Sequence, residues 1–87
     1  MSVVVPARNE AGNLESLVRR LPALGPADEL IFVEGHSTDD TWAEMQRVAA
    51  AAPHVPITCI RQAGRGKGDA VRMGFAHATR DILLILD

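Results

Sequence analysis

The stretch Asp81-Ile82-Leu83-Leu84-Ile85-Leu86-Asp87 decides the fold, because five consecutive apolar residues end on an acid. The run is too short for a membrane helix, and its length and composition are typical of a strand that is buried on both faces of a parallel sheet. In such sheets ligands bind beyond the carboxyl ends of the strands. Asp87 is therefore a candidate for holding a metal ion or a phosphate group.

Three shorter apolar runs precede this one, at residues 3–5, 29–33 and 57–60, and each reads as a strand. Between these runs, apolar residues recur at the spacing typical of one face of a helix. The first helix is indicated by Leu14, Leu17, Val18 and Leu21, the second by Trp42, Met45, Val48 and Ala49, and the third by Ala70, Val71, Gly74, Phe75 and Ala78. The resulting order, βαβαβαβ, predicts an α/β fold: a three-layer, Rossmann-like half-sheet with mainly parallel strands.

The composition of the 87 residues is that of one soluble globular domain, with 47% apolar and 23% charged residues. A net charge of −2 without a basic cluster argues against a nucleic-acid groove. No apolar stretch approaches the ~20 residues of a membrane helix, so a cytoplasmic location is the default expectation. Cys59 lies inside an apolar run and is expected to be a core residue.

Polar residues gather in the segments that follow the predicted strands. Glu34, at the tip of the second strand, is placed to bind a ribose or a base, with a helix cap or a solvated acid as the alternative. Ser37 and Asp39 are expected to cap the second helix. His36 is expected to be a solvated loop histidine, because no second histidine or cysteine lies near it to form a zinc site.

The glycine-rich loop at residues 64–68 fits neither of the common phosphate-binding patterns. Lys67 is followed by Gly68 where the Walker pattern requires Ser or Thr, and Asp69 takes the place of the last glycine of the dinucleotide pattern. What remains is a cationic helix N-terminus with Arg65 and Lys67, which either steadies an anion or serves as a plain entry to the helix.

Taken together, these segments resemble the N-terminal part of family 2 glycosyltransferases, which have the GT-A fold. Residues 3–10 (Val-Val-Val-Pro-Ala-Arg-Asn-Glu) look like the opening strand and loop of that family, and residues 32–41 resemble its second-strand motif. Residues 66–72 are similar to its Gly-Lys-Gly-x-Ala segment. Residues 82–87 look like the strand that leads into its Asp-x-Asp metal motif. The polyprenyl-phosphate-sugar and cell-envelope branches are the most similar.

The resemblance implies a parent enzyme that transfers a sugar, with inversion, from a nucleotide-diphosphate donor to an acceptor, assisted by Mg²⁺ or Mn²⁺. It implies no catalytic residue within this chain. Asp87 would contact the metal, and the nucleotide sugar would contact Pro6, Ala7, Arg8, Glu10, Val33, Glu34, Gly35, Lys67 and Asp87. The family commonly has two acids where Glu34 and Gly35 stand, so the resemblance leaves the choice between a UDP- and a GDP-linked donor open.

The family's second Asp, its acceptor-binding part and its catalytic base follow the point that Asp87 occupies. Residues 1–87 are therefore expected to be the nucleotide-sugar-binding part of a truncated glycosyltransferase domain, inactive alone. The candidate acceptor is a polyprenyl phosphate, which would place the parent peripherally at the cytoplasmic face of the membrane. The strand at 82–86 is expected to form a homo-oligomer by pairing with a second copy.

Two other classes of protein are compatible with a layered α/β build. A non-catalytic nucleotide-binding or interaction module would explain the short length without truncation. A response-regulator-like phosphoacceptor domain requires clustered acids at the ends of its first and third strands, where this chain has Pro6-Ala7-Arg8 and Arg61-Gln62. The second of these alternatives is therefore disfavoured.

Overall fold

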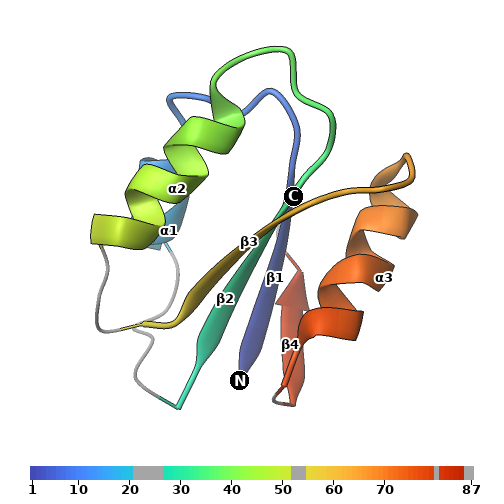
Figure 1. The fold of residues 1–87 in the computed structure, drawn as a ribbon. Coiled ribbons are helices and arrows are strands. Elements are labelled where there is room, and N and C mark those ends of the chain that lie inside the picture. Colours follow the sequence, from blue (N-terminus) through green and yellow to red (C-terminus); the bar gives the residue numbers. More distant parts are fainter. Residues whose placement is uncertain (21–26, 52–54, 80, 86–87) are drawn as a thin grey trace.

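The computed structural model describes residues 1–20, 27–51, 55–79 and 81–85, and the fold is given for these residues. The elements are β1 (Ser2–Ala7), α1 (Leu14–Arg20), β2 (Glu29–Glu34), α2 (Thr41–Ala51), β3 (Ile57–Arg61), α3 (Lys67–His77) and β4 (Ile82–Ile85). Figure 1 shows one sheet with α1 and α2 on one face and α3 on the other. The predicted three-layer α/β architecture is confirmed.

The sheet has four parallel strands in the order β3-β2-β1-β4. The chain steps from β1 outward to β2 and β3, and then returns through α3 to β4 on the other side of β1. Because parallel crossovers are right-handed, this reversal of direction puts α3 on the face opposite α1 and α2. The carboxyl end of β1 is thus the point where the strand order reverses, which is where open α/β sheets bind ligands.

Side chains of the two central strands alternate between two cores, as the period of two in a strand requires. On the face of α1 and α2, one core contains Val3, Val5, Leu14, Leu30, Phe32 and Met45, with Cys59 packed against it. On the face of α3, the other core contains Val4, Ile31, Val33 and Ala70. Cys59, expected to be a buried core residue, is half-buried and packs against the edge of the first core. Its partial burial raises the pKa of its thiol.

Helix α3 packs against β1 through a glycine. A β-carbon on residue 74 would lie 2.2 Å from Cγ1 of Val4, so only glycine permits this approach. The expected apolar stripe is partly wrong, because Phe75 is 42% exposed and Met73 packs against the sheet instead. Successive helical residues are turned by about 100°, so a helix that faces the sheet with residues 70, 73 and 74 turns residue 75 toward solvent.

A buried acid, Glu29, connects the chain segments at the amino-terminal edge of the sheet. Glu29 is 6% exposed, and its carboxylate accepts hydrogen bonds from the Ser2 hydroxyl and from both the backbone N–H (2.7 Å) and the hydroxyl (2.9 Å) of Thr79. These bonds join β1, β2 and the segment before β4. The polar groups named here at this edge are satisfied by one another.

This architecture bears on two expectations from the sequence: whether a helix spans a membrane, and whether the last strand pairs with a second copy. Among the described residues, α1, α2 and α3 are each too short and too polar to cross a bilayer. Strand β4 pairs with β1 at one edge of the sheet, and its pairing with a second copy stays a prediction.

Candidate functional site

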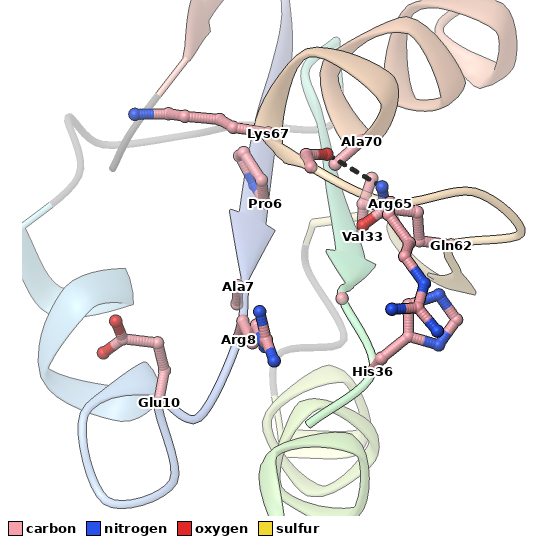
Figure 2. A pocket seen from close by; sticks show the side chains of 12 residues that line it. Pro6, Ala7, Arg8, Glu10, Val33, His36, Gln62, Arg65, Lys67 and Ala70 are labelled. Atoms are coloured by element: carbon pink, nitrogen blue, oxygen red, sulfur yellow. Dashed lines mark hydrogen bonds between the residues drawn. The ribbon is translucent and has the colours of Figure 1, made fainter. Parts of the chain in front are cut away.

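A cavity of about 550 Å³ opens at the carboxyl edge of β1 and β2, beside the first turn of α3 (Figure 2). Its volume falls in the range of roughly 300–1,000 Å³ that small-molecule sites occupy. The cavity is lined by Pro6, Ala7, Arg8, Glu10, Val33, Gly35, His36, Gln62, Arg65, Gly66, Lys67 and Ala70. Three segments that are far apart in the sequence, at residues 6–10, 33–36 and 62–70, therefore meet around one cavity.

Most of the predicted nucleotide-sugar contacts lie around this cavity. Those that line it are Pro6, Ala7, Arg8, Glu10, Val33, Gly35 and Lys67. Glu34 does not line it, and Asp87 lies outside the described residues. The structure thus brings together the predicted residues of the first loop, of the end of β2 and of α3.

Glu34 points away from the cavity because neighbouring strand residues face opposite sides of a sheet, and Val33 faces the α3 side. It is 6% exposed, and its carboxylate accepts a hydrogen bond from the backbone N–H of Ser37. Glu34 therefore closes the turn after β2, a role that differs from both the helix cap and the solvated acid considered from the sequence. Its contact with a nucleotide stays a prediction.

The loop after β1 is held by side chains of the loop after β2. The backbone N–H of Asn9 donates to the Ser37 hydroxyl (2.9 Å), and that of Glu10 donates to the Thr41 hydroxyl (2.8 Å). Asn9 has a positive φ of 54°, and its side-chain oxygen accepts the backbone N–H of Thr38 (2.8 Å). The backbone that carries Arg8 and Glu10 to the cavity is therefore fixed by side chains about 30 residues further along the chain.

Glu44 on α2 extends this support to the start of α1. Its carboxylate accepts the backbone N–H groups of Gly12 and Leu14, the latter at 2.9 Å. Leu14 is the first residue of α1, and its N–H is among those that a helix leaves without a partner at its N-terminus, whereas Gly12 belongs to the loop before the helix. No pattern in the sequence pointed to Glu44, because the contact joins residues on two different helices.

The two predicted capping residues behave differently. Asp39 accepts the backbone N–H of Thr41 (3.0 Å) and its hydroxyl, so the expectation that it caps α2 is confirmed. The hydrogen bond from the Thr41 hydroxyl lowers the pKa of Asp39. The expectation for Ser37 is wrong, because its hydroxyl accepts the Asn9 N–H rather than an N–H of α2.

His36 joins two of the loops that border the cavity. It has a φ of 60°, and its Nε2 lies 2.7 Å from the carbonyl oxygen of Gly64. Since a carbonyl can only accept, Nε2 carries the proton. The side chain is exposed, as expected for a loop histidine, but it also lines the cavity and bonds to the glycine-rich loop.

The glycine-rich loop is shaped by Gln62 and Asp69. Nε2 of Gln62 donates to the carbonyl oxygen of Gly66 (2.8 Å; dashed line in Figure 2) and to the carboxylate of Asp69 (2.9 Å). A β-carbon on residue 64 would lie 2.6 Å from that carboxylate, so any other residue there would displace the Asp69 side chain. Gly66 has a φ of +86°, a conformation that favours glycine. The sequence showed the glycines but not Gln62 as a residue of the site.

The charges and surfaces of the cavity suit a ligand with two unlike ends. Of its lining residues, Arg8, Arg65 and Lys67 are cationic and Glu10 is the one acid. Pro6, Ala7, Val33 and Ala70 provide apolar surface. Within the described part of the chain, no group of three or more His, Cys, Asp or Glu residues could hold a metal ion. The cavity is built for an anionic group together with a flat or apolar one.

Comparison with known proteins places the chain in a family of transferases that act on sugars. It belongs to glycosyl transferase family 2, whose family model matches residues 2–87. The resemblance identified from the four sequence motifs is therefore confirmed.

Several curated relatives are named undecaprenyl-phosphate 4-deoxy-4-formamido-L-arabinose transferase. The proteins from Klebsiella pneumoniae and Sodalis glossinidius are 31% and 32% identical to the chain over 91 residues. The matches cover 100% of the chain and 28% of each relative, so the chain spans less than a third of their length.

A solved structure shares the fold. It is the mannosyltransferase PcManGT from Pyrobaculum calidifontis in complex with GDP-Man and Mn²⁺, with a TM-score of 0.81 and 29% sequence identity. The superposition covers 90% of this chain and 24% of that one. The described residues thus share the Rossmann-like fold of GT-A glycosyltransferases.

Proposed function

We propose that this chain binds the nucleotide-diphosphate-sugar donor of a glycosyltransferase, with uridine or guanosine as the base. The observation that carries the proposal is the cavity at the carboxyl edge of the sheet, where three cationic side chains and one acid meet an apolar wall. The GDP-Man in the related mannosyltransferase supports the same ligand class.

Each part of the donor has a counterpart among the residues that line the cavity. The apolar surface of Pro6, Ala7 and Val33 fits the faces of a base and a ribose. The carboxylate of Glu10 is suited to accept hydrogen bonds from ribose hydroxyls. Arg8, Arg65 and Lys67 are suited to the diphosphate, because charge-assisted bonds to phosphate oxygens are strong.

A divalent cation, Mg²⁺ or Mn²⁺, is proposed to accompany the diphosphate, and the Mn²⁺ of the related mannosyltransferase supports this. The described residues by themselves offer no cluster of metal ligands, so the proposed site rests on Asp87. When bound, such a cation neutralises charge on a diphosphate leaving group.

The activity of the whole protein is proposed to be sugar transfer with inversion to a polyprenyl phosphate. The names of the curated relatives, which include undecaprenyl phosphate, support this acceptor class. A cytoplasmic enzyme attached peripherally to the membrane would reach both a soluble donor and a lipid-linked acceptor.

The direct test is calorimetric titration of the protein with UDP and GDP, each with and without Mn²⁺. We expect saturable binding of one nucleoside diphosphate, strengthened by Mn²⁺. ADP and CDP serve as control ligands of equal charge. Equal affinity for all four nucleotides would indicate attraction by charge alone and would contradict a donor site, and absence of binding would contradict it as well.

A further inference from the structure

Gln62 is a buried polar residue at the cavity whose position is fixed at both ends. It directly follows β3, and its backbone N–H donates to the carbonyl oxygen of Glu34 (2.8 Å). The residue is 5% exposed, yet it lines the cavity. A side chain held in this way presents its remaining polar atom in one defined place.

The orientation of the Gln62 amide is determined by its two partners. Nε2 lies 2.8 Å from the Gly66 carbonyl oxygen and 2.9 Å from the Asp69 carboxylate. Both of these groups can only accept hydrogen bonds, so a flipped amide would place oxygen against oxygen twice. Both N–H donors of the amide are therefore used, and Oε1 must point the other way.

Oε1 of Gln62 faces the gap beside Gly35. It lies 3.2 Å from the position that a β-carbon on residue 35 would occupy, and the Ala7 carbonyl oxygen and the Arg8 β-carbon lie 3.6 Å from the same position. All four residues line the cavity. Among the residues that the structure describes, none donates a hydrogen bond to Oε1. No enclosed side-chain oxygen or nitrogen of the described residues lacks a partner, so Oε1 is open to the cavity rather than sealed in the core. A ligand that supplies an N–H or O–H can take the place of water at this oxygen.

The nucleobase is the part of the donor that suits this position. A carbonyl oxygen repels the oxygens of a diphosphate, which leaves a base N–H or a ribose O–H as the partner. The ribose hydroxyls already have a proposed partner in Glu10 on the loop after β1, whereas Gln62 directly follows β3. The base is therefore the part of the donor that we assign to Gln62. Val33 and Ala70 supply apolar surface for a flat ring in the same cavity.

We propose that Oε1 of Gln62 accepts a hydrogen bond from a ring N–H of the donor's nucleobase, which makes Gln62 a specificity-determining residue. This inference rests on the proposed function. The ring N–H of uracil or guanine would bond to Oε1 of Gln62, whose position is fixed by the bonds of Nε2 to Asp69 and Gly66. A side chain on residue 35 would crowd this oxygen, which is consistent with the glycine there.

The test is a cycle in which the protein and the ligand are changed separately and together. The protein is titrated with UDP and 3-methyl-UDP, and with GDP and 1-methyl-GDP, because each methyl group removes the ring N–H. The same titrations are made on Gln62→Met, which keeps the length of the side chain without its polar atoms. Gln46→Met is the matched control, since Gln46 is an exposed residue of α2 outside the cavity. Such a cycle isolates the pairwise interaction from a general loss of binding.

In the wild type and in Gln46→Met, methylation of the bound base is expected to weaken binding about tenfold. In Gln62→Met the methylated and unmethylated ligands should bind within about twofold of each other. Equal sensitivity to methylation in all three proteins would overturn the inference while leaving the donor site intact. If the wild type binds neither UDP nor GDP, the proposed function fails and the inference fails with it.

A second measurement on the wild type does not depend on the folding of a variant. The side-chain N–H signals of Gln62 are followed by NMR during titration with UDP and with 2′-deoxy-UDP, or with the guanosine pair. A shift of the Gln62 signals that is retained with the deoxy ligand but lost with the N-methylated base supports the inference. Loss of the shift with the deoxy ligand would assign Oε1 to the ribose and overturn it.

Discussion

The carboxylate of Glu44 accepts the backbone N–H of Leu14 at 2.9 Å, so a side chain of α2 caps the first turn of α1. The same carboxylate accepts the N–H of Gly12. Since the loop between β1 and α1 carries Arg8 and Glu10 to the cavity, Glu44 supports the site without lining it. It is a positioning residue that links the helix layer to the donor-binding edge.

Replacing Glu44 with alanine is expected to destabilise the fold by about 1–3 kcal/mol, because two backbone N–H groups lose their acceptor. Urea unfolding measures this loss. Glu15→Ala is the matched control, since the Glu15 side chain is 68% exposed and pairs with Arg19 at the surface. Equal loss of stability in the two variants would contradict the capping role of Glu44.

Gly74→Ala is expected to destabilise the protein by about 1–3 kcal/mol, because the new methyl group would meet Val4 at 2.2 Å in a packed core. Gly68→Ala in the same helix has no closer neighbour than 3.7 Å and is expected to be neutral or stabilising by up to ~1 kcal/mol. The two variants are compared by urea unfolding. The account of α3 packing fails if Gly74→Ala is as stable as Gly68→Ala.

Asp39 is expected to make the stability of the protein depend on acid pH. The hydrogen bond from the Thr41 hydroxyl holds the pKa of Asp39 below its usual value of 3.8. A carboxyl whose pKa is lower in the folded state stabilises the fold above its unfolded pKa, and this contribution disappears as the pH falls through the folded value. Asp39→Asn should therefore be less stable than the wild type near neutral pH, and the difference should shrink below about pH 4. If the difference in stability between Asp39→Asn and the wild type stayed constant across this pH range, it would contradict stabilisation of the ionised Asp39 carboxylate in the folded state. The effect is expected to be small because Asp39 is exposed.

Arg65→Ala is expected to weaken nucleoside diphosphate binding about tenfold, because one charge-assisted contact is removed from the cavity. The loss should diminish as the salt concentration rises. Arg19→Ala removes the same charge from α1 outside the cavity and should bind like the wild type. Equal affinities of the two variants would exclude Arg65 from the diphosphate site.

The architecture could be predicted from the sequence because each helix or strand is indicated by residues that lie close together in the chain. The apolar strand at 82–86 and the helical spacing of Leu14, Leu17 and Val18 each identify an element from neighbouring residues. The face of α3 was harder to predict, because apolar residues at 70 and 71 and small or apolar residues at 74 and 75 leave two possible stripes. Only the close approach of Gly74 to Val4 decides between them.

Arg8 and Gly35 could be predicted at the cavity because they follow strands directly, and Lys67 because it begins α3 after the glycine-rich loop. Gln62 and Glu44 were not predicted, because their roles arise from contacts between separate loops and helices. Gln62 acquires a defined orientation only through Asp69 and Gly66, and Glu44 acts on a residue 30 positions away. Spacing in a single sequence carries no information about such pairs.

A map of NMR shifts during titration with UDP and with GDP, in the presence of Mg²⁺, tests whether the cavity at the carboxyl ends of β1 and β2 is the donor site. We expect one of the two nucleotides to shift the NMR signals of residues around the cavity, namely Arg8, Glu10, Gly35, His36 and Arg65. The signals of Ser2, Glu29 and Thr79, at the opposite edge of the sheet, should stay unchanged. Saturable binding with shifts confined to the opposite edge, or no shifts with either nucleotide, would contradict a donor site at the carboxyl ends of β1 and β2.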